Sequence, residues 1–180
     1  MSFVIHSGNA TRISKSKLIW ARHFLRWRYV YLLVVPMFFL TWLYFIQHYQ
    51  IGINVVTPSL PYKVVLIAKN ASVRRGDLFV FKWHGGDPWP NGASFFKVVK
   101  GLPGDLVEVK GREVFINGTS VGVAKERSSS GVPVAVIAPG VIPPGRIYAY
   151  APHRDSLDSR YQTTGLISER DVIGVAHVLF

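Results

Sequence analysis

The sequence predicts a mainly β protein, in which one antiparallel β domain follows a single N-terminal transmembrane helix. Three observations support this fold class. Residues 29–46 form an apolar run without any charge. Beyond it, short runs of β-branched and aromatic residues alternate with Gly, Pro, Asn and Asp, which is typical of strands and turns. Finally, Asn117 and Gly118 supply the two positive-φ positions of a type I′ hairpin turn.

The apolar run defines the predicted domain organisation. As a helix it would be about 27 Å long, close to the roughly 30 Å of a bilayer's hydrocarbon core. It is too long for a signal peptide, and no small-residue cleavage site follows it. Six basic residues and no acidic residue precede it, so the positive-inside rule predicts a cytoplasmic N-terminus. We therefore expect a single-pass protein of the bacterial inner membrane, with a basic cytoplasmic segment (1–28), an anchor (29–49) and a periplasmic β-rich domain (50–180).

The predicted strands follow from the apolar runs between turn residues. In chain order they are residues 64–68, 78–82, 95–99, 106–109, 113–116, 119–123, 134–137, 146–151 and 172–179. Residues 83–94 and 125–131 are rich in Gly, Pro or Ser and are predicted to be surface loops.

Composition narrows the possible functions. The absence of Cys excludes disulfides, thiolate nucleophiles and cysteine metal sites. The formal charge of +11 arises mostly before Tyr29, and fifteen basic residues face ten acidic ones thereafter. This distribution favours membrane topology over nucleic-acid binding. The six histidines lack metal-ligand spacing, so we expect no metal and no cofactor.

Ser59 and Lys97 are the candidate reactive residues. Ser59 lies in "VTPSLP", where Pro58 and Pro61 steer the backbone away from helix. It lies about ten residues beyond the anchor, which places it within roughly 35 Å of the bilayer. Lys97 shares a predicted strand face with Phe95 and Val99. Burial would lower its pKa and make it a base, although alternation alone favours an edge-strand lysine whose head reaches water.

Four segments carry a family resemblance. Residues 74–82, 95–109, 141–165 and 171–176 resemble, in order and spacing, the signature boxes of type I signal peptidases. The combination of Lys-x-x-x-Gly-Leu-Pro-Gly-Asp with Asp-Ser-Arg is specific. The short box "TPSLP", the single anchor and the small size are more similar to the conjugative-transfer (TraF-type) branch. Members of that branch mature the pilin of the mating apparatus, and some join the ends of the pilin into a ring.

The resemblance implies a role for each matching residue and a signal-peptidase-like β domain. Ser59 is the expected nucleophile and Lys97 the general base. The hydroxyl of Thr57 and the backbone N–H of Ser59 are expected to stabilise the oxyanion, although Thr57 is equally well explained as a turn residue. The remaining residues are expected to support the site. Ser156 would orient the lysine amine, and Asp158 and Arg160 would brace the site as an ion pair. This chain has one residue fewer before that serine than the family often has.

These features predict a membrane-anchored serine endopeptidase with a Ser/Lys dyad that processes an exported membrane-associated precursor, with the conjugative pilin as the expected substrate. The sequence does not decide whether the protein also joins the ends of the pilin into a ring. One alternative is a general type I signal peptidase that cleaves secretory signal peptides, and another is a non-catalytic assembly component of a conjugative secretion channel. The expected partners are the protein substrate, the inner membrane and conjugative type IV secretion components, without nucleic acid.

Overall fold

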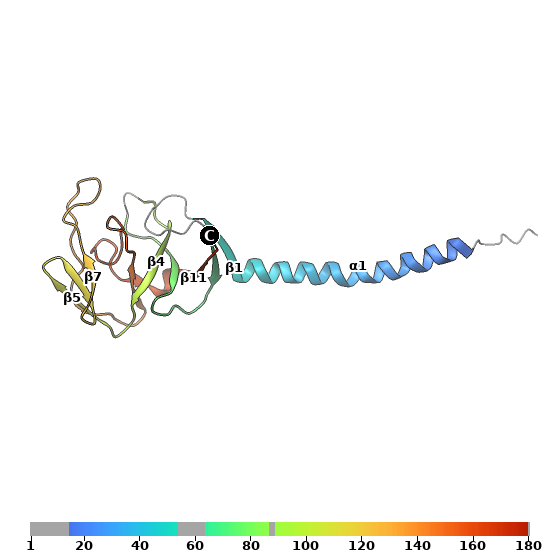
Figure 1. The fold of residues 1–180 in the computed structure, drawn as a ribbon, viewed down its shortest axis with the longest axis horizontal. Coiled ribbons are helices and arrows are strands. Elements are labelled where there is room, and N and C mark those ends of the chain that lie inside the picture. Colours follow the sequence, from blue (N-terminus) through green and yellow to red (C-terminus); the bar gives the residue numbers. More distant parts are fainter. Residues whose placement is uncertain (1–14, 54–63, 87–88, 180) are drawn as a thin grey trace, which may run out of the picture. The chain divides into compact units, whose positions relative to one another are not determined.

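The computed structural model describes residues 15–53, 64–86 and 89–179, with side chains from Trp27 onward (Figure 1). The chain divides into two compact units, Met1–Phe45 and Ile46–Phe180. Two of the predicted site residues, Thr57 and Ser59, lie outside the described residues. The other predicted site residues all lie in the second unit.

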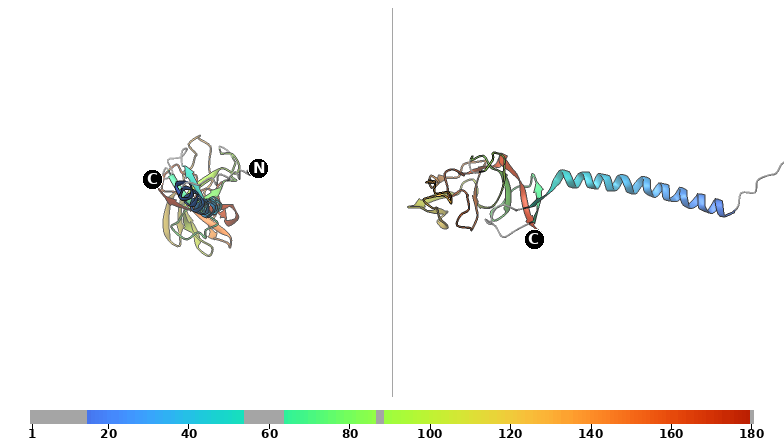
Figure 2. Two further views of the ribbon diagram at one scale, coloured as in Figure 1. Left: turned by 90° about the vertical axis from the view of Figure 1, so that its right-hand side faces the viewer. Right: turned by 90° about the horizontal axis from the view of Figure 1, so that it is seen from above.

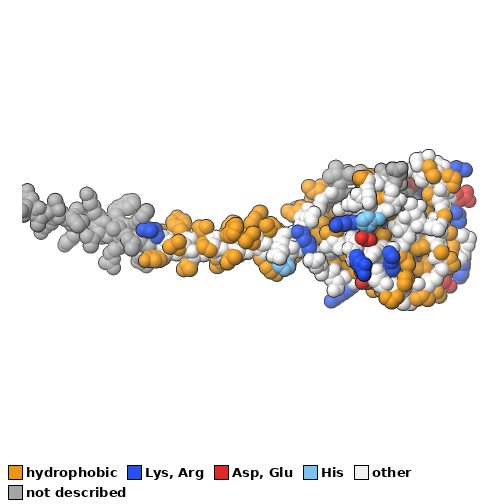
Figure 3. All heavy atoms as spheres, turned by 180° about the vertical axis from the view of Figure 1, so that it is seen from behind, with side chains coloured by type: hydrophobic (Ala, Val, Ile, Leu, Met, Phe, Trp, Pro, Cys, Tyr) orange, Lys and Arg blue, Asp and Glu red, His pale blue; other side chains and the backbone are white. Residues whose placement is uncertain are grey.

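The first unit is helical. The helix α1 spans Lys15–His48 and contains Pro36 in its interior. Its segment Trp27–His48 is long and apolar enough to cross a membrane, and none of it is buried by protein. Figure 3 shows apolar side chains covering much of the visible face of this segment. The predicted N-terminal helix of membrane-spanning length is therefore confirmed.

The second unit is a β domain, which Figure 2 shows from two further sides. It is built on a seven-stranded antiparallel sheet in the order β1-β2-β11-β3-β4-β9-β10. The strands are β1 (Tyr49–Ile53), β2 (Val64–Lys69), β11 (Val172–Val178), β3 (Leu78–Lys82), β4 (Ser94–Gly101), β9 (Arg146–Tyr150) and β10 (Ile167–Ser168). A 3₁₀ turn, η1 (Glu169–Asp171), connects β10 to β11. Lys69 of β2 donates from Nζ to the carbonyl oxygen of Ile46 over 2.9 Å. The predicted fold class, mainly antiparallel β, is confirmed.

A second, four-stranded sheet has the order β7-β6-β5-β8. Its strands are β5 (Leu106–Lys110), β6 (Glu113–Ile116), β7 (Thr119–Val123) and β8 (Gly140–Val141). The turn between β6 and β7 has φ of 50° at Asn117 and 75° at Gly118, so the predicted hairpin is confirmed. Buried residues of this sheet pack with residues of β9 and the segment before it to form one core: Val107, Val114, Ile116, Val121, Ile137, Ile142 and Tyr148.

One predicted strand is wrong. Residues 134–137 form no ladder, because their backbone groups go to separate partners. Val134 N donates to Glu126 O, whereas Ile137 N donates to Arg160 O. Only an isolated bridge joins Val136 to Tyr161. Conversely, β1, β8 and β10 were not predicted, and Tyr49, assigned above to the anchor, begins β1.

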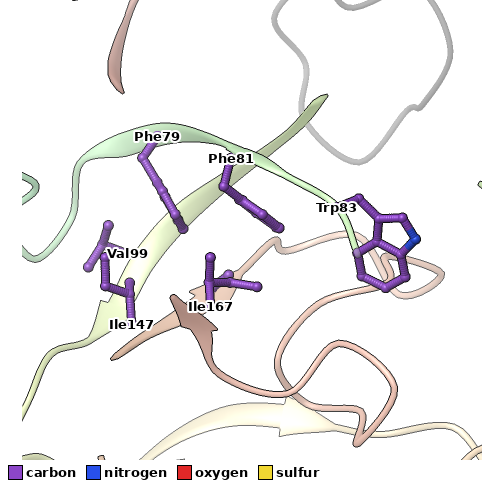
Figure 4. Close-up of a cluster of buried hydrophobic side chains, with 7 residues drawn as sticks. Phe79, Phe81, Trp83, Val99, Ile147 and Ile167 are labelled. Atoms are coloured by element: carbon purple, nitrogen blue, oxygen red, sulfur yellow. The ribbon is translucent and has the colours of Figure 1, made fainter. Parts of the chain in front are cut away.

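A second core lies on one face of the large sheet (Figure 4), and Val65, Ile67, Val80 and Ala176 form a third. Phe79 and Phe81 stack with ring centroids 5.3 Å apart, and they face the aliphatic side chains of Val99, Ile147 and Ile167. Trp83 extends this core beyond β3 and is 1% exposed. The prediction that residues 83–94 are a surface loop is therefore wrong at its first residue.

Gly101, at the end of β4, makes a close approach that predicts a measurable cost of substitution. A Cβ atom there would lie 2.5 Å from Ile142 Cδ1 and 2.8 Å from Tyr148 Cβ. We expect Gly101→Ala to destabilise the domain by about 1–3 kcal/mol through overpacking, measured as the shift in thermal unfolding. Ser94→Ala, at an exposed position of the same strand, is the control. An unchanged Tm for Gly101→Ala would contradict the packing described.

Candidate active site

Lys97 is a buried cation in the middle of the large sheet. Its strand, β4, pairs with β3 on one side and β9 on the other, and Lys97 lies opposite Phe79. The prediction of an edge-strand lysine from alternation alone is therefore wrong, whereas the predicted shared face with Val99 is confirmed, because both are buried. The side chain of Lys97 is one of the most enclosed polar groups of the domain, with the residue 3% exposed.

Burial lowers the pKa of Lys97 from 10.5 to about 8, because a dry environment disfavours the ammonium form. The negative charge of Asp158 opposes this effect, and the positive charge of Arg160 adds to it. Within the part of the chain that the structure describes, Nζ makes no hydrogen bond and no ion pair. It lies 5.5 Å from the centroid of the Phe95 ring. Lys97 thus has the protonation behaviour that a general base needs.

Asp158 and Arg160 form a buried, bidentate ion pair. Arg160 Nε donates to Asp158 Oδ1 and Nη2 donates to Oδ2, both over 2.9 Å. The other bonds of the pair reach the backbone, where Ala151 N donates to Asp158 Oδ2 and Arg160 Nη2 donates to the carbonyl oxygens of Ala151 and His153. Burial would lower the pKa of Arg160, but the hydrogen bond and charge of Asp158 outweigh it and raise that pKa.

The ion pair lies beside the lysine because of the sheet register. β4 and β9 pair Val98 with Tyr150 and Val99 with Ala149. One further step of this register places Ala151 opposite Lys97, at the point where Asp158 binds the backbone. The structure therefore brings together three of the predicted site residues, Lys97, Asp158 and Arg160.

Ser156 is buried close to this pair in sequence, with 1% of the residue exposed. Its backbone N–H donates to His153 O over 3.1 Å. Its hydroxyl oxygen has no hydrogen-bond partner among the residues that the structure describes, Lys97 included. A buried hydroxyl with unused donor and acceptor capacity is available to a reacting group.

The turn after the lysine strand contains a network of hydrogen bonds around the carboxylate of Asp105. Gly104 has φ of 91°, and the carboxylate of Asp105 accepts from Leu102 N and Asn117 Nδ2. It also accepts two bonds from Arg75 Nη2. Burial would raise the pKa of Asp105, but these hydrogen bonds and the charge of Arg75 lower it overall. The roles of Arg75 and Asn117 were missed, because nothing in their local sequence indicates the partner.

Other features of the domain do not coincide with this cluster. A hollow of about 390 Å³ lies between β8 and the segment around Gln162, and a smaller one of about 170 Å³ lies beside His84; neither is lined by Lys97. Among the described residues no group of His, Cys, Asp and Glu side chains has the arrangement of a metal site. The chemical groups that the described part of the site provides are therefore the buried amine of Lys97, the buried hydroxyl of Ser156 and the ion pair of Asp158 and Arg160.

Comparison with known proteins gives consistent matches. The family model for signal peptidase, peptidase S26, matches residues 24–180. The conjugal transfer protein TraF of Agrobacterium fabrum (strain C58) is 32% identical over 143 residues, which covers 69% of this chain and 80% of that protein. Signal peptidase I U of Bacillus subtilis is 32% identical over 113 residues, covering 59% of this chain and 57% of that protein. A crystal structure of a signal peptidase I from Enterococcus faecalis V583 is 26% identical and covers 58% of this chain and 97% of that one, with a TM-score of 0.36.

Proposed function

This chain belongs to the signal peptidase family, peptidase S26, and we propose that it is a membrane-anchored serine endopeptidase that uses Ser59 and Lys97 to cleave an exported, membrane-associated precursor. The observation that carries the proposal is the enclosed amine of Lys97, whose pKa is lowered to about 8. An ordinary lysine, with a pKa near 10.4, is neutral in fewer than roughly one molecule in a thousand at pH 7. With a pKa of about 8, roughly a tenth of the molecules carry a neutral amine.

In the proposed mechanism, Ser59 Oγ attacks the scissile carbonyl carbon while Lys97 Nζ accepts the hydroxyl proton. The backbone N–H of Ser59 and the hydroxyl of Thr57 stabilise the oxyanion that forms. When the C–N bond breaks, the ammonium of Lys97 returns the proton to the leaving amine. An ester then links Ser59 to the N-terminal part of the substrate until water, or an amine in the case of ring closure, attacks it.

The supporting residues act on the lysine and on its surroundings. We propose that Ser156 Oγ, which is buried and unpaired among the described residues, accepts a hydrogen bond from the amine of Lys97 and orients it. The ion pair of Asp158 and Arg160 holds the backbone at Ala151 beside the lysine. The opposite effects of the two charges on the pKa of Lys97 partly cancel, which leaves burial as the main control.

The expected substrate is a conjugative pilin. The support is the similarity to a conjugal transfer protein over most of both chains. The basic residues before the anchor favour a cytoplasmic N-terminus for residues 1–28 and a periplasmic β domain. In that arrangement, the anchor begins at about residue 29 and ends with α1 at His48, and the peptidase domain begins with β1 at Tyr49. The domain would then meet substrates at the outer face of the inner membrane, together with components of a conjugative secretion channel.

The test is mass spectrometry of the candidate pilin, recovered from cells that express the wild type, Ser59→Ala or the control Ser94→Ala. We expect mature pilin with the wild type and the control, and only uncut precursor with Ser59→Ala. A mature pilin lighter by one water than its linear form would show ring closure. Pilin processed normally with Ser59→Ala would contradict the proposal. In that case loss of secretory-precursor cleavage in the same cells would indicate a general signal peptidase, and unchanged cleavage a non-catalytic assembly component.

A further inference from the structure

We propose that Trp83 is a positioning residue for Lys97, which keeps water away from the amine by holding the ring of Phe95 over it. This inference rests on the proposed function for Lys97 as the base. It assigns a role to the described part of the segment between β3 and β4, residues 83–86 and 89–93, which contains both tryptophans of the β domain, Trp83 and Trp89.

The first link is between Phe95 and the amine. Phe95 lies two residues before Lys97 on β4, so the two side chains leave the same face of the sheet. Nζ lies 5.5 Å from the centroid of the Phe95 ring. Phe95 is only partly buried, so its side chain meets the exterior as well as the amine, and we expect its position to affect how much water reaches the amine.

The second link is between Trp83 and Phe95. The two rings are nearly parallel, with 10° between their planes and 4.8 Å between their centroids. Trp89 meets the same ring edge-on, at 88° and 5.9 Å. Because Trp83 is itself buried, its indole holds one face of the Phe95 ring in place. Trp89 limits the movement of the Phe95 ring in another direction.

Trp83 is in turn held by the segment that contains it. Its backbone N–H donates to Ala93 O, and its carbonyl oxygen accepts from Gly92 N, both over 2.7 Å. The indole Nε1 donates to Gly86 O over 3.0 Å. A Cβ atom at Gly85 would lie 2.2 Å from the indole ring, so the backbone there packs directly on it. The described part of this segment is therefore built around the indole.

Removal of the indole has a predictable direction. Without the indole, the Phe95 ring can move and water can reach the amine. Burial lowers the pKa of Lys97, so this hydration would raise it. Loss of the attraction between the ammonium and the Phe95 ring would act in the opposite direction. Burial is the largest cause of the lowered pKa of Lys97, so we expect its relief to dominate. The pKa of Lys97 should therefore rise when Trp83 is truncated.

The experiment uses the full-length protein in detergent micelles. Trace acetylation with acetic anhydride at a series of pH values, followed by mass spectrometry, gives the titration midpoint of Lys97 without any need for cleavage. We expect Trp83→Ala to raise this midpoint by about one pH unit, equal to a tenfold change in the neutral fraction. Trp83→Phe, which keeps an aromatic stack, should raise it by less. Val114→Ala, in the core of the four-stranded sheet, is the control for loss of stability and should leave the midpoint unchanged.

The activity profile provides the second readout. Pilin cleavage by Trp83→Ala should be about tenfold slower than wild type at pH 7 and should recover as the pH rises above the new midpoint. An unchanged midpoint in both Trp83 variants would overturn the proposal, as would a loss of cleavage that is equal at every pH. If Trp83→Ala does not fold, a midpoint in Trp83→Phe equal to that of the wild type is the contradicting result. A wild-type midpoint near 8 together with cleavage that survives Ser59→Ala would instead count against the proposed function alone.

Discussion

Lys97→Met is expected to yield a protein that is more stable than the wild type at pH 7 and has lost its peptidase activity. Methionine is an unbranched side chain of similar length, and it brings no charge into the apolar surroundings of Phe79, Phe95 and Val99. Loss of the general base should reduce cleavage by roughly 10³-fold or more. Stability and activity thus move in opposite directions, which a merely structural lysine would not produce.

The gain in stability follows from the lowered pKa of Lys97. The ordinary pKa of 10.5 applies to the unfolded chain and the value of about 8 to the folded one. Between these two values the unfolded state binds more protons, so the stability of the wild type rises with pH across this window. Below pH 8 the full penalty remains, which amounts to about 3 kcal/mol at 1.36 kcal/mol per pKa unit. Lys97→Met removes this penalty and with it the rise in stability between pH 8 and 10.5.

Unfolding by heat or denaturant at pH 7 and at pH 10 measures both effects, and pilin cleavage measures the loss of activity. Lys100→Met is the matched control, because Lys100 is an exposed lysine on the same strand. It should change stability by less than about 0.5 kcal/mol. A Lys97→Met protein that cleaves normally, or that is clearly less stable than the wild type at pH 7, would contradict the assignment of Lys97.

Asp158→Asn is expected to destabilise the domain by about 3–5 kcal/mol, because it leaves the guanidinium of Arg160 buried without a counter-charge. Both residues are almost fully enclosed, with side-chain exposures of 0% for Asp158 and 4% for Arg160. Solvent therefore screens this pair little. The amide keeps one oxygen acceptor, which can serve the N–H of Ala151. Its NH2 group then faces the two Arg160 N–H groups that donate to Oδ1 in the wild type, so the expected loss comes from the charge and from these hydrogen bonds together.

The exposed ion pair between Lys125 and Asp155 offers the matched comparison. Its side chains are 28% and 48% exposed, so Asp155→Asn should cost less than about 1 kcal/mol. The double variant Asp158→Asn with Arg160→Met should be more stable than Asp158→Asn alone, because it removes the uncompensated charge. Equal unfolding free energies for Asp158→Asn and the wild type would contradict the buried pair. The expected loss of stability corresponds to a decrease in Tm on the order of 10 °C.

The strands that could be predicted from sequence are those whose pattern is local. Residues 78–82 and 113–116 alternate or are continuously apolar between turn residues, and they match β3 and β6. The strands β8 and β10 have two residues each, too few for any periodicity. The strand β1 contains Gly52 and pairs with β2, so its existence depends on a strand that begins only at Val64.

The candidate site shows the same division between local and non-local information. Alternation along β4 correctly placed Lys97 with Val99, but it could not show that β3 and β9 flank the strand, because that pairing joins residues about 18 and 50 positions away. Likewise, the Gly- and Pro-rich composition of residues 83–94 indicates a surface loop, whereas the stacking of Trp83 on Phe95 is visible only once β3 and β4 are paired. The proposed roles of Ser59 and Thr57 remain predictions from the family motif.

The direct passage from α1 to β1, with His48 and Tyr49 as neighbours, has a practical consequence for preparing the domain without its anchor. A truncation at the end of the helix would place a new charged terminus at the first residue of a sheet strand that pairs along its whole length with β2. It would also remove Ile46, whose carbonyl oxygen accepts from Lys69. A detergent-free version of the domain is therefore best begun upstream of Ile46, with the exposed apolar residues of that last helical turn exchanged for polar ones instead of deleted.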